Sequence, residues 1–179
     1  MATRTAEYRM RLLAARRWTW SSFRVDRRYL ERAIELAETG MASGRGGPFG
    51  ALVVRGDEVL AEGFNQVTTA LDPTAHAEVV AIRAACQRLG GFSLAGCQIY
   101  SSCEPCPMCL AAIYWARLDR LYFAASRSDA AAIGFDDEFL YQELAKNTRE
   151  RQLPTEQALR DVAAQMMLRW REVPPERRY

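Results

Sequence analysis

The chain lacks several features that would mark other classes of protein. Its 179 residues hold no apolar run near the roughly 18 residues of a membrane-spanning helix, which excludes an integral membrane protein. The first residues hold no apolar stretch flanked like a secretory signal. We therefore expect a cytoplasmic location, where the five cysteines bind metal or stay free. Histidine occurs once, as His76, so any imidazole chemistry must use that residue or borrow one from a partner.

The remaining composition is that of one folded domain with a real core. Hydrophobic residues make up 49% of the chain and charged residues 26%, which excludes wholesale disorder. The net charge of +2 is unevenly spread, since residues 1–28 carry eight arginines against two acidic residues. The rest of the chain is therefore mildly acidic, which argues against a long surface that tracks phosphates. We expect neither a nucleic-acid nor a membrane partner.

We expect residues 1–24 to be an Arg-rich N-terminal extension and residues 25–179 to be the single domain. The plain interpretation of the extension is a loosely held terminus or a start codon assigned too early. Its arginines and its two tryptophans, Trp18 and Trp20, also fit a basic amphipathic helix that tethers the protein to a membrane or nucleic acid, or a targeting peptide.

Helices and strands alternate along the body. Two apolar runs, Phe49–Val54 and Val59–Phe64, flank a four-residue turn and predict an antiparallel hairpin. Further strands are expected at Gln98–Ser101 and Arg120–Ala124, and a polar loop at Asn65–Pro73. Helices are expected from Asp26 to about Gly40, from Thr74 to about Leu89, and at Cys106–Ala116, Glu138–Ala145 and Thr155–Trp170. This order predicts a three-layer α/β/α fold with a mixed central sheet.

Two short segments at the starts of predicted helices carry the chemistry. They read His76-Ala-Glu78 and Pro105-Cys106-Pro-Met-Cys109. The two cysteines lie three residues apart, hence on one helix face, at an N-terminus that favours thiolate. With His76 as third ligand they suit tetrahedral Zn²⁺, and three protein ligands leave the fourth position for water. Glu78 then faces that water as general acid and base, the pattern of zinc deaminases.

A closed zinc site is the alternative. Cys103 lies three residues before Cys106, so a Cys₃His site with no open position is imaginable, as is a zinc fold used only for binding. Glu78 would have no role in either. The other two cysteines, Cys86 and Cys97, are expected to be buried thiols that pack as small apolar groups.

Beyond these motifs, the chain resembles the cytidine-deaminase superfamily, and within it the bacterial guanine deaminases. The resemblance spans about residues 26–146 and is weaker from there to the terminal tyrosine. It rests on residues 46–51, 72–78, 102–109, 112–117 and 134–137, together with Asn65. It implies a cytidine-deaminase-like fold, one Zn²⁺ per subunit, and hydrolysis of guanine to xanthine and ammonia in purine metabolism.

The resemblance also implies three residues that hold the base. Asn65 would hydrogen-bond the base edge, Asp137 would accept from its N–H groups, and Phe49 would stack on its ring. Each has a structural alternative. Asn65 is a turn former, Asp137 and its neighbour Asp136 are typical helix caps, and Phe49 opens a strand and suits a core.

Three further assignments follow from the resemblance and from the helix N-termini. Backbone N–H groups near Ala77 and Cys106 are expected to help hold the base and its developing charge. Trp115 is expected to line the pocket, although packing on an apolar helix is its ordinary role. Guanine deaminases of this kind are dimers that exchange their C-terminal segments, so Tyr179 is expected to close the pocket of the partner subunit in a domain-swapped homodimer.

Other deaminase substrates remain open at this point. A tRNA adenosine deaminase shares the zinc motifs, and it would need a basic surface around an open pocket. The arginines near both ends of the chain are compatible with that substrate, whereas the acidic body is not. Cytosine and guanosine differ from guanine by a few pocket contacts.

Overall fold

The computed structural model describes residues 24–174 and 177, and its centre is a four-stranded mixed sheet. In spatial order the strands are β2 (Glu58–Phe64), β1 (Gly50–Arg55), β3 (Gln98–Cys103) and β4 (Arg120–Ala125). The pairs β2–β1 and β1–β3 are antiparallel, and β3–β4 is parallel. The predicted hairpin and the predicted mixed sheet are both confirmed.

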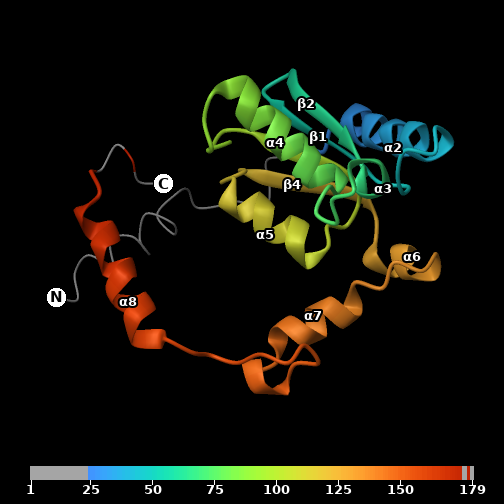
Figure 1. Cartoon of the computed structure of the whole chain (residues 1–179). Helices are drawn as coiled ribbons and strands as arrows, with labels where there is room; N and C mark the ends of the chain where they lie inside the picture. The colour runs from blue at the N-terminus through green and yellow to red at the C-terminus, as the bar shows by residue number, and fades with distance from the viewer. Residues whose placement is uncertain (1–23, 175–176, 178–179) are drawn as a thin grey trace.

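Helices cover both faces of this sheet (Figure 1). On one face α2 (Arg27–Ala42) packs Ala33 and Leu36 against Leu52 and Tyr100 of the strands. On the other face lie α4 (Ala77–Leu89) and α5 (Pro107–Trp115), whose apolar residues share one core with strands β1, β2 and β3. The three-layer α/β/α prediction is therefore correct.

The helix starts agree with the sequence at two places and differ at a third. Asp26 caps α2 by accepting from the backbone N–H of Arg28 at 3.1 Å, and α5 begins with a proline in its first turn. The predicted cap Thr74 does not cap α4, which begins three residues later at Ala77. Thr74 belongs instead to a turn held by Asp72, whose Oδ1 accepts from the backbone N–H of Thr74 at 2.8 Å and from its hydroxyl at 2.7 Å.

Three further differences lie in the connections. The loop predicted at Asn65–Pro73 contains a short helix, α3 (Val67–Ala70). Helix α6 (Arg127–Ala132), which begins in a capping box, was not predicted. The predicted final helix is shorter, because Leu159 takes a left-handed backbone conformation and α8 (Arg160–Leu168) begins only after it.

The chain beyond β4 leaves the layers, and we call residues 126–174 the arm. It contains α6, α7 (Glu138–Ala145), η1 (Thr148–Glu150), α8 and η2 (Arg169–Glu172). Figure 1 shows α7 and α8 standing apart from the sheet and its helices. Among the described residues of the arm, Ala130 is the one buried side chain. The predicted extension, apart from Arg24, and Tyr179 fall outside the described residues.

No helix within residues 24–174 is both long and apolar enough to cross a membrane.

Candidate active site

Two helix N-termini meet on one face of the sheet and bring the predicted metal ligands together. His76 is the N-cap of α4, Cys106 is the N-cap of α5, and Cys109 lies in the first turn of α5. The start of α4 lies close against β2 because Gly63 has no side chain. A Cβ there would stand 2.6 Å from the carbonyl oxygen of Ala77.

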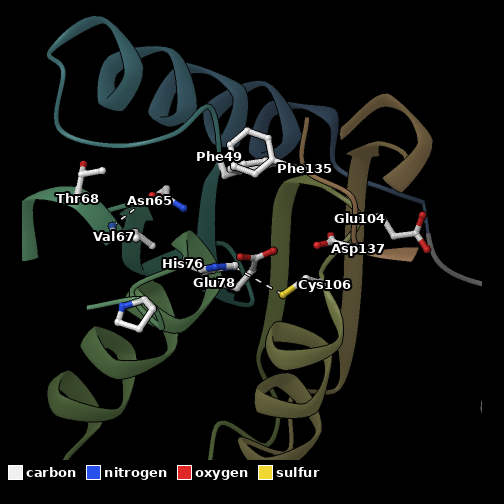
Figure 2. A pocket seen from close by; sticks show the side chains of 11 residues that line it. Phe49, Asn65, Val67, Thr68, His76, Glu78, Glu104, Cys106, Phe135 and Asp137 are labelled. Carbon is white, nitrogen blue, oxygen red and sulfur yellow. Dashed lines mark hydrogen bonds between the residues drawn. The ribbon is translucent and has the colours of Figure 1, made fainter. Parts of the chain in front are cut away.

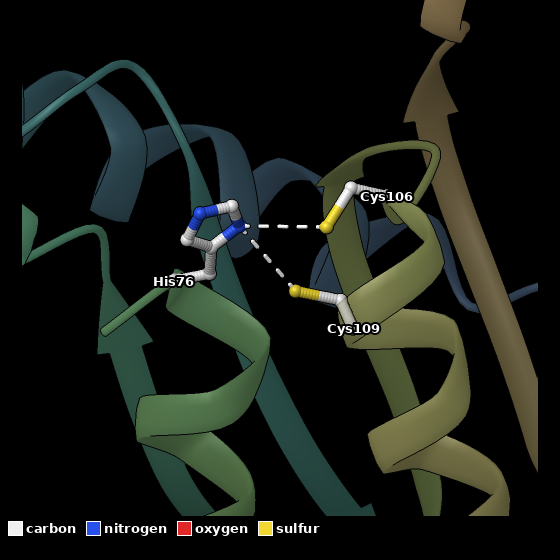
Figure 3. A group of neighbouring side chains, drawn as sticks. All are labelled: His76, Cys106 and Cys109. Atoms are coloured by element: carbon white, nitrogen blue, oxygen red, sulfur yellow. Dashed lines mark hydrogen bonds between the residues drawn. The ribbon is translucent and has the colours of Figure 1, made fainter. Parts of the chain in front are cut away.

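The spacing of these three side chains fits a zinc ion. The Nδ1 atom of His76 lies 3.6 Å from Sγ of Cys106 and 3.5 Å from Sγ of Cys109 (Figure 3). Ligand bonds of about 2.05 Å to nitrogen and 2.3 Å to sulfur, at a tetrahedral angle, place N and S about 3.6 Å apart. All three ligand atoms lie within 4.8 Å of one another. The donor set and its spacing therefore suit a single tetrahedral Zn²⁺.

The alternative with Cys103 as a fourth ligand is wrong in this geometry. The thiol of Cys103 donates to the carbonyl oxygen of Ser126 at 3.5 Å, and burial raises its pKa to about 11. It does not belong to the metal-ligating group formed by His76, Cys106 and Cys109. The site therefore has three protein ligands and one open position, which is the arrangement of catalytic zinc.

The two ligand thiols are electrostatically coupled. A hydrogen bond from Cys109, together with the contact to His76, lowers the pKa of Cys106 to about 4. Cys109 holds the shared proton, and its pKa is raised by Cys106 and by burial. A lowered thiol pKa suits a zinc ligand, because zinc binds cysteine as the thiolate.

Glu78 lies beside the ligands in the first turn of α4 and is only 5% exposed. Burial raises the pKa of its carboxyl group. Ser101, on β3, donates its hydroxyl to Oε1 of Glu78 at 3.1 Å and so holds the carboxylate in place. Sequence reasoning missed Ser101, since a serine inside a strand carries no motif.

A cavity of about 240 Å³ opens over these groups (Figure 2). It is smaller than the roughly 300–1,000 Å³ that drug-sized ligands occupy. Both segments that carry the chemistry and the connection from α6 to α7 contribute to its wall. Its lining residues are Phe49, Asn65, Val67, Thr68, Pro73, His76, Glu78, Glu104, Cys106, Phe135 and Asp137.

Asn65 is buried in the cavity wall with its amide oriented by the backbone. Its Oδ1 accepts from the N–H groups of Gly47 at 3.3 Å and Val67 at 3.2 Å. The oxygen is thereby engaged, and the NH₂ group is the part of the side chain left for a ligand. Gly46 makes this arrangement possible, because a Cβ there would stand 1.6 Å from the backbone oxygen of Asn65.

The two neighbouring aspartates divide the roles that the sequence left open. Asp136 accepts from the backbone N–H of Glu138 at 3.1 Å and so satisfies the start of α7. Asp137 is the N-cap residue, yet its side chain makes no capping bond and lines the cavity instead. Burial raises the pKa of Asp137. Figure 2 shows Asp137 and Asn65 on opposite sides of the His76–Cys106 pair.

Two aromatic rings close one wall of the cavity. Phe49 packs edge-on against Phe135, with ring centroids 4.8 Å apart and planes at 89°. The predicted Phe49 is thus at the cavity, while Phe135 was not singled out. The sequence could have indicated Phe135, because it directly precedes the aspartate pair in the Gly-Phe-Asp-Asp segment.

Three predicted residues are placed elsewhere or lie outside the description. Trp115 does not line the cavity. It is the last residue of α5, at the end of the helix opposite Cys106, and its side chain is 69% exposed. The side chain of Ala77 is packed in the core, so only its backbone N–H is a candidate for binding. Tyr179 is outside the described residues.

Comparisons with known proteins identify the family of the chain. A sequence profile described as the cytidine and deoxycytidylate deaminase zinc-binding region matches residues 23–125. A guanine deaminase of Bacillus subtilis (strain 168) is 49% identical over 151 residues, which cover 84% of this chain and 97% of that protein. The X-ray structure of guanine deaminase from Bacillus subtilis matches with a TM-score of 0.83 and 47% identity. That match covers 87% of this chain and 99% of that chain.

Two other matches are shorter. A tRNA-specific adenosine deaminase of Aquifex aeolicus (strain VF5) is 38% identical over 102 residues, which cover 57% of this chain and 62% of that protein. A solved complex of a mutant of the protein NE0047 with 8-azaguanine has a TM-score of 0.58 and 34% identity, covering 61% of this chain and 63% of that chain. With the profile match over more than half its length, the chain belongs to the cytidine and deoxycytidylate deaminase zinc-binding family.

Proposed function

We propose that the protein is a zinc-dependent guanine deaminase, which hydrolyses guanine to xanthine and ammonia. One observation carries the proposal: one small cavity is lined by the metal ligands His76 and Cys106, by Glu78, and by Asn65 and Asp137. The third ligand, Cys109, is buried beside the first two. The similarity to the Bacillus subtilis guanine deaminase along nearly its whole length supports it, whereas the tRNA-specific relative matches over a shorter segment.

Recognition of the base is proposed to use opposite hydrogen-bonding groups at the two sides of the cavity. The NH₂ group of Asn65 donates to the acceptors of guanine, O6 or N7. The carboxylate of Asp137 accepts from the ring N–H groups. The two groups together suit a base that offers acceptors on one edge and donors on another. Phe49 presents its ring to the face of the base, and Phe135 holds that ring in place.

His76, Cys106 and Cys109 would hold the zinc, which when bound supplies Lewis-acid activation of water. Glu78 would take one proton from the attacking water and pass it to N3, while the water oxygen adds to C2 of guanine. Glu78 would then take the remaining proton of the added hydroxyl and pass it to the exocyclic amine, so that the C2–N bond breaks, the C2=O bond forms and ammonia leaves. Burial raises the pKa of Glu78, and a raised pKa favours a carboxyl group that must return the proton it takes.

The test is release of ammonia by the zinc-loaded protein from guanine, guanosine, adenine and cytosine in parallel, with an anticodon-arm RNA as a further substrate. We expect xanthine from guanine, and little product from the nucleoside or the RNA. No product from guanine, together with activity on another substrate, would support the zinc chemistry and reject guanine as the substrate. Zinc binding with no deamination of any substrate would reject the enzyme altogether.

We also propose a homodimer in which the arm of one copy packs against the other and Tyr179 closes the cavity of that copy. The support is the apolar surface of α8, where Val162 and Met166 stand four residues apart, 66% and 52% exposed, on a helix with no buried residue. Sedimentation would detect the dimer. Deletion of the last few residues should slow guanine turnover, and an unchanged rate would remove the role of Tyr179.

A cytoplasmic location and the division into an extension (1–24) and one domain (25–179) remain proposals. The five cysteines are free of disulfides in the structure, as suits a reducing compartment. Removal of residues 1–24 should leave zinc binding and guanine turnover unchanged, and localisation of the tagged full-length chain would test the compartment.

A further inference from the structure

Asp137 reaches the cavity from a helix that has almost no packing of its own. None of the eight residues of α7, all of them described, is buried. Asp137 and Tyr141 are four residues apart and so lie on one face of this helix. The backbone N–H of Tyr141 also donates to the carbonyl oxygen of Asp137 at 3.1 Å. The position of Tyr141 therefore sets that of Asp137.

Tyr141 attaches this helix directly to the metal site. Its hydroxyl donates to the backbone oxygen of Pro105 at 3.2 Å, and Pro105 stands immediately before the ligand Cys106. Tyr141 is half-buried, whereas the three residues that precede it on α7 are exposed. One side-chain hydrogen bond thus joins the helix that carries Asp137 to the loop that carries a zinc ligand.

Arg127 supports the same attachment from α6. Its guanidinium lies over the ring of Tyr141, 5.1 Å from the ring centroid, and 3.7 Å from the carboxylate of Glu138. Its backbone N–H donates to Oε2 of Glu104 at 3.1 Å. The start of α6 and the face of α7 are therefore both fastened to the Glu104–Pro105–Cys106 loop.

We propose that Tyr141 is a positioning residue, supported by Arg127, that holds Asp137 at a fixed place over the zinc site. The inference rests on the proposed function, in which Asp137 binds the base. Tyr141 itself does not line the cavity, so its effect on the reaction passes through Asp137. Loss of its hydroxyl frees α7 to move away from the loop. A displacement of about 1 Å at a binding group is enough to reduce turnover substantially.

The test is Tyr141→Phe in the zinc-loaded enzyme, with Tyr29→Phe as matched control. Tyr29 makes the same kind of bond, from its hydroxyl to the backbone oxygen of Asp57 at 3.1 Å, but it lies on α2 and away from the cavity. We expect Tyr141→Phe to lower kcat/KM for guanine about five- to tenfold, mainly through KM, as the loss of one hydrogen bond allows. Zinc content should not change, and Tyr29→Phe should stay within about twofold of wild type.

A double-mutant cycle separates positioning from a merely structural role. In an Asp137→Ala background, Tyr141→Phe should have no further effect on kcat/KM, because the group that it positions is gone. The inference is overturned if Tyr141→Phe lowers kcat/KM by the same factor in wild type and in Asp137→Ala. It is also overturned if Tyr141→Phe lowers kcat/KM in neither of them. Arg127→Met should behave like Tyr141→Phe with a smaller loss.

Hydrogen exchange gives a readout that needs no substrate. Amides of residues 134–142 in the zinc-loaded protein should exchange faster in Tyr141→Phe than in wild type or in Tyr29→Phe. Unchanged exchange would overturn the inference. A wild-type protein that is inactive on guanine would overturn the proposed function instead. The hydrogen-exchange result would still show whether the Tyr141 hydroxyl attaches α7 to the loop.

Discussion

The body and the arm differ in how they are held, although both contribute to the cavity. We call residues 26–125 the body. Its sheet is packed between α2 on one face and α4 and α5 on the other, and the buried apolar residues of the two main core clusters all lie in it. The arm, residues 126–174, buries Ala130 alone among its described residues. The metal ligands and Glu78 come from the body, whereas Phe135 and Asp137 come from the arm.

This difference separates two requirements of catalysis. Metal binding and proton transfer need atoms held to a few tenths of an ångström, and a tightly packed core supplies that rigidity. The proposed substrate contacts come from both regions, because Asn65 and Phe49 lie in the body and Asp137 lies in the arm. Changes at the metal ligands, at Glu78 or in the core are therefore expected to abolish chemistry or folding, and changes in the arm to alter the choice and binding of substrate.

The largest effect is expected for Glu78→Gln in the body. The amide cannot take or return the protons, so kcat on guanine should fall about 10³-fold, within the range for general acid–base groups. The zinc content should stay at one ion per chain, since Glu78 is not a ligand. Steady-state kinetics and metal analysis measure both. Near-native activity in this variant would remove Glu78 from the mechanism.

Asp137→Ala tests the corresponding residue of the arm. We expect kcat/KM for guanine to fall about 100-fold, because a hydrogen bond to a charged acceptor contributes about 1.5–3 kcal/mol. Zinc content should not change, and activity on other bases should fall less. Kinetics on a panel of purines and pyrimidines would show this. Equal losses on every base would move Asp137 from substrate selection to the chemistry itself.

Two truncations to alanine compare the packing of the two regions. Leu52 is fully buried, and Leu52→Ala should lower the free energy of unfolding by about 2–5 kcal/mol. Met167, on α8, is 67% exposed, and Met167→Ala should change it by at most about 0.5 kcal/mol in dilute protein. Urea unfolding measures both.

Repeating these unfolding measurements at higher protein concentration tests the proposed dimer. The effect of Met167→Ala should then grow, because a homodimer that covers α8 is favoured by mass action. An effect that stays small at every concentration would mean that no second copy covers this helix.

The smallest effect is expected for a surface ion pair of the body. Arg32, on α2, donates to both carboxylate oxygens of Glu62, on β2, each at 2.8 Å, and lowers the pKa of Glu62 below its ordinary 4.5. A lowered pKa means that the stabilisation is present above about pH 4.5 and is lost as pH falls further. Glu62→Gln should therefore cost no more than about 1 kcal/mol at neutral pH, and nothing in acid. Urea unfolding at several pH values would measure the difference, and a cost that persists in acid would contradict the pairing.

The zinc site was predictable because each of its two segments is a short motif that can be recognised by itself, although the two segments lie far apart in the sequence. Two cysteines three apart, a helix start with proline in its first turn, and a histidine followed by a glutamate at the next helix start each have a local signature. The strands were predictable for the same reason, since runs of apolar residues between turns are local patterns. The error at Thr74 had a local cause as well, because Asp72 accepts from both the backbone N–H and the hydroxyl of Thr74 and holds it in a turn before the helix.

The rest of the cavity is made by contacts between distant residues. Ser101 reaches Glu78 across 23 positions of sequence, and Tyr141 reaches Pro105 across 36. No local sequence pattern around Ser101 or Tyr141 predicts these contacts. The misplacement of Trp115 shows the converse, because a residue on a catalytic helix can still stand at the end that points away from the site.

The sequence by itself determined the alternation of helices and strands and the class of chemistry, and it predicted the ligand set and the acid–base residue. Each of these depends on short motifs, whose spacings of one to four residues the geometry of a helix or strand turns directly into side-chain positions. Only the tertiary structure decided that Asp137 rather than Asp136 faces the cavity, that Cys103 stands aside from the metal, and that Asn65 presents its NH₂ group. Those outcomes depend on which backbone groups, near and distant in sequence, each side chain meets in the folded chain, and tertiary packing decides which of them are within reach.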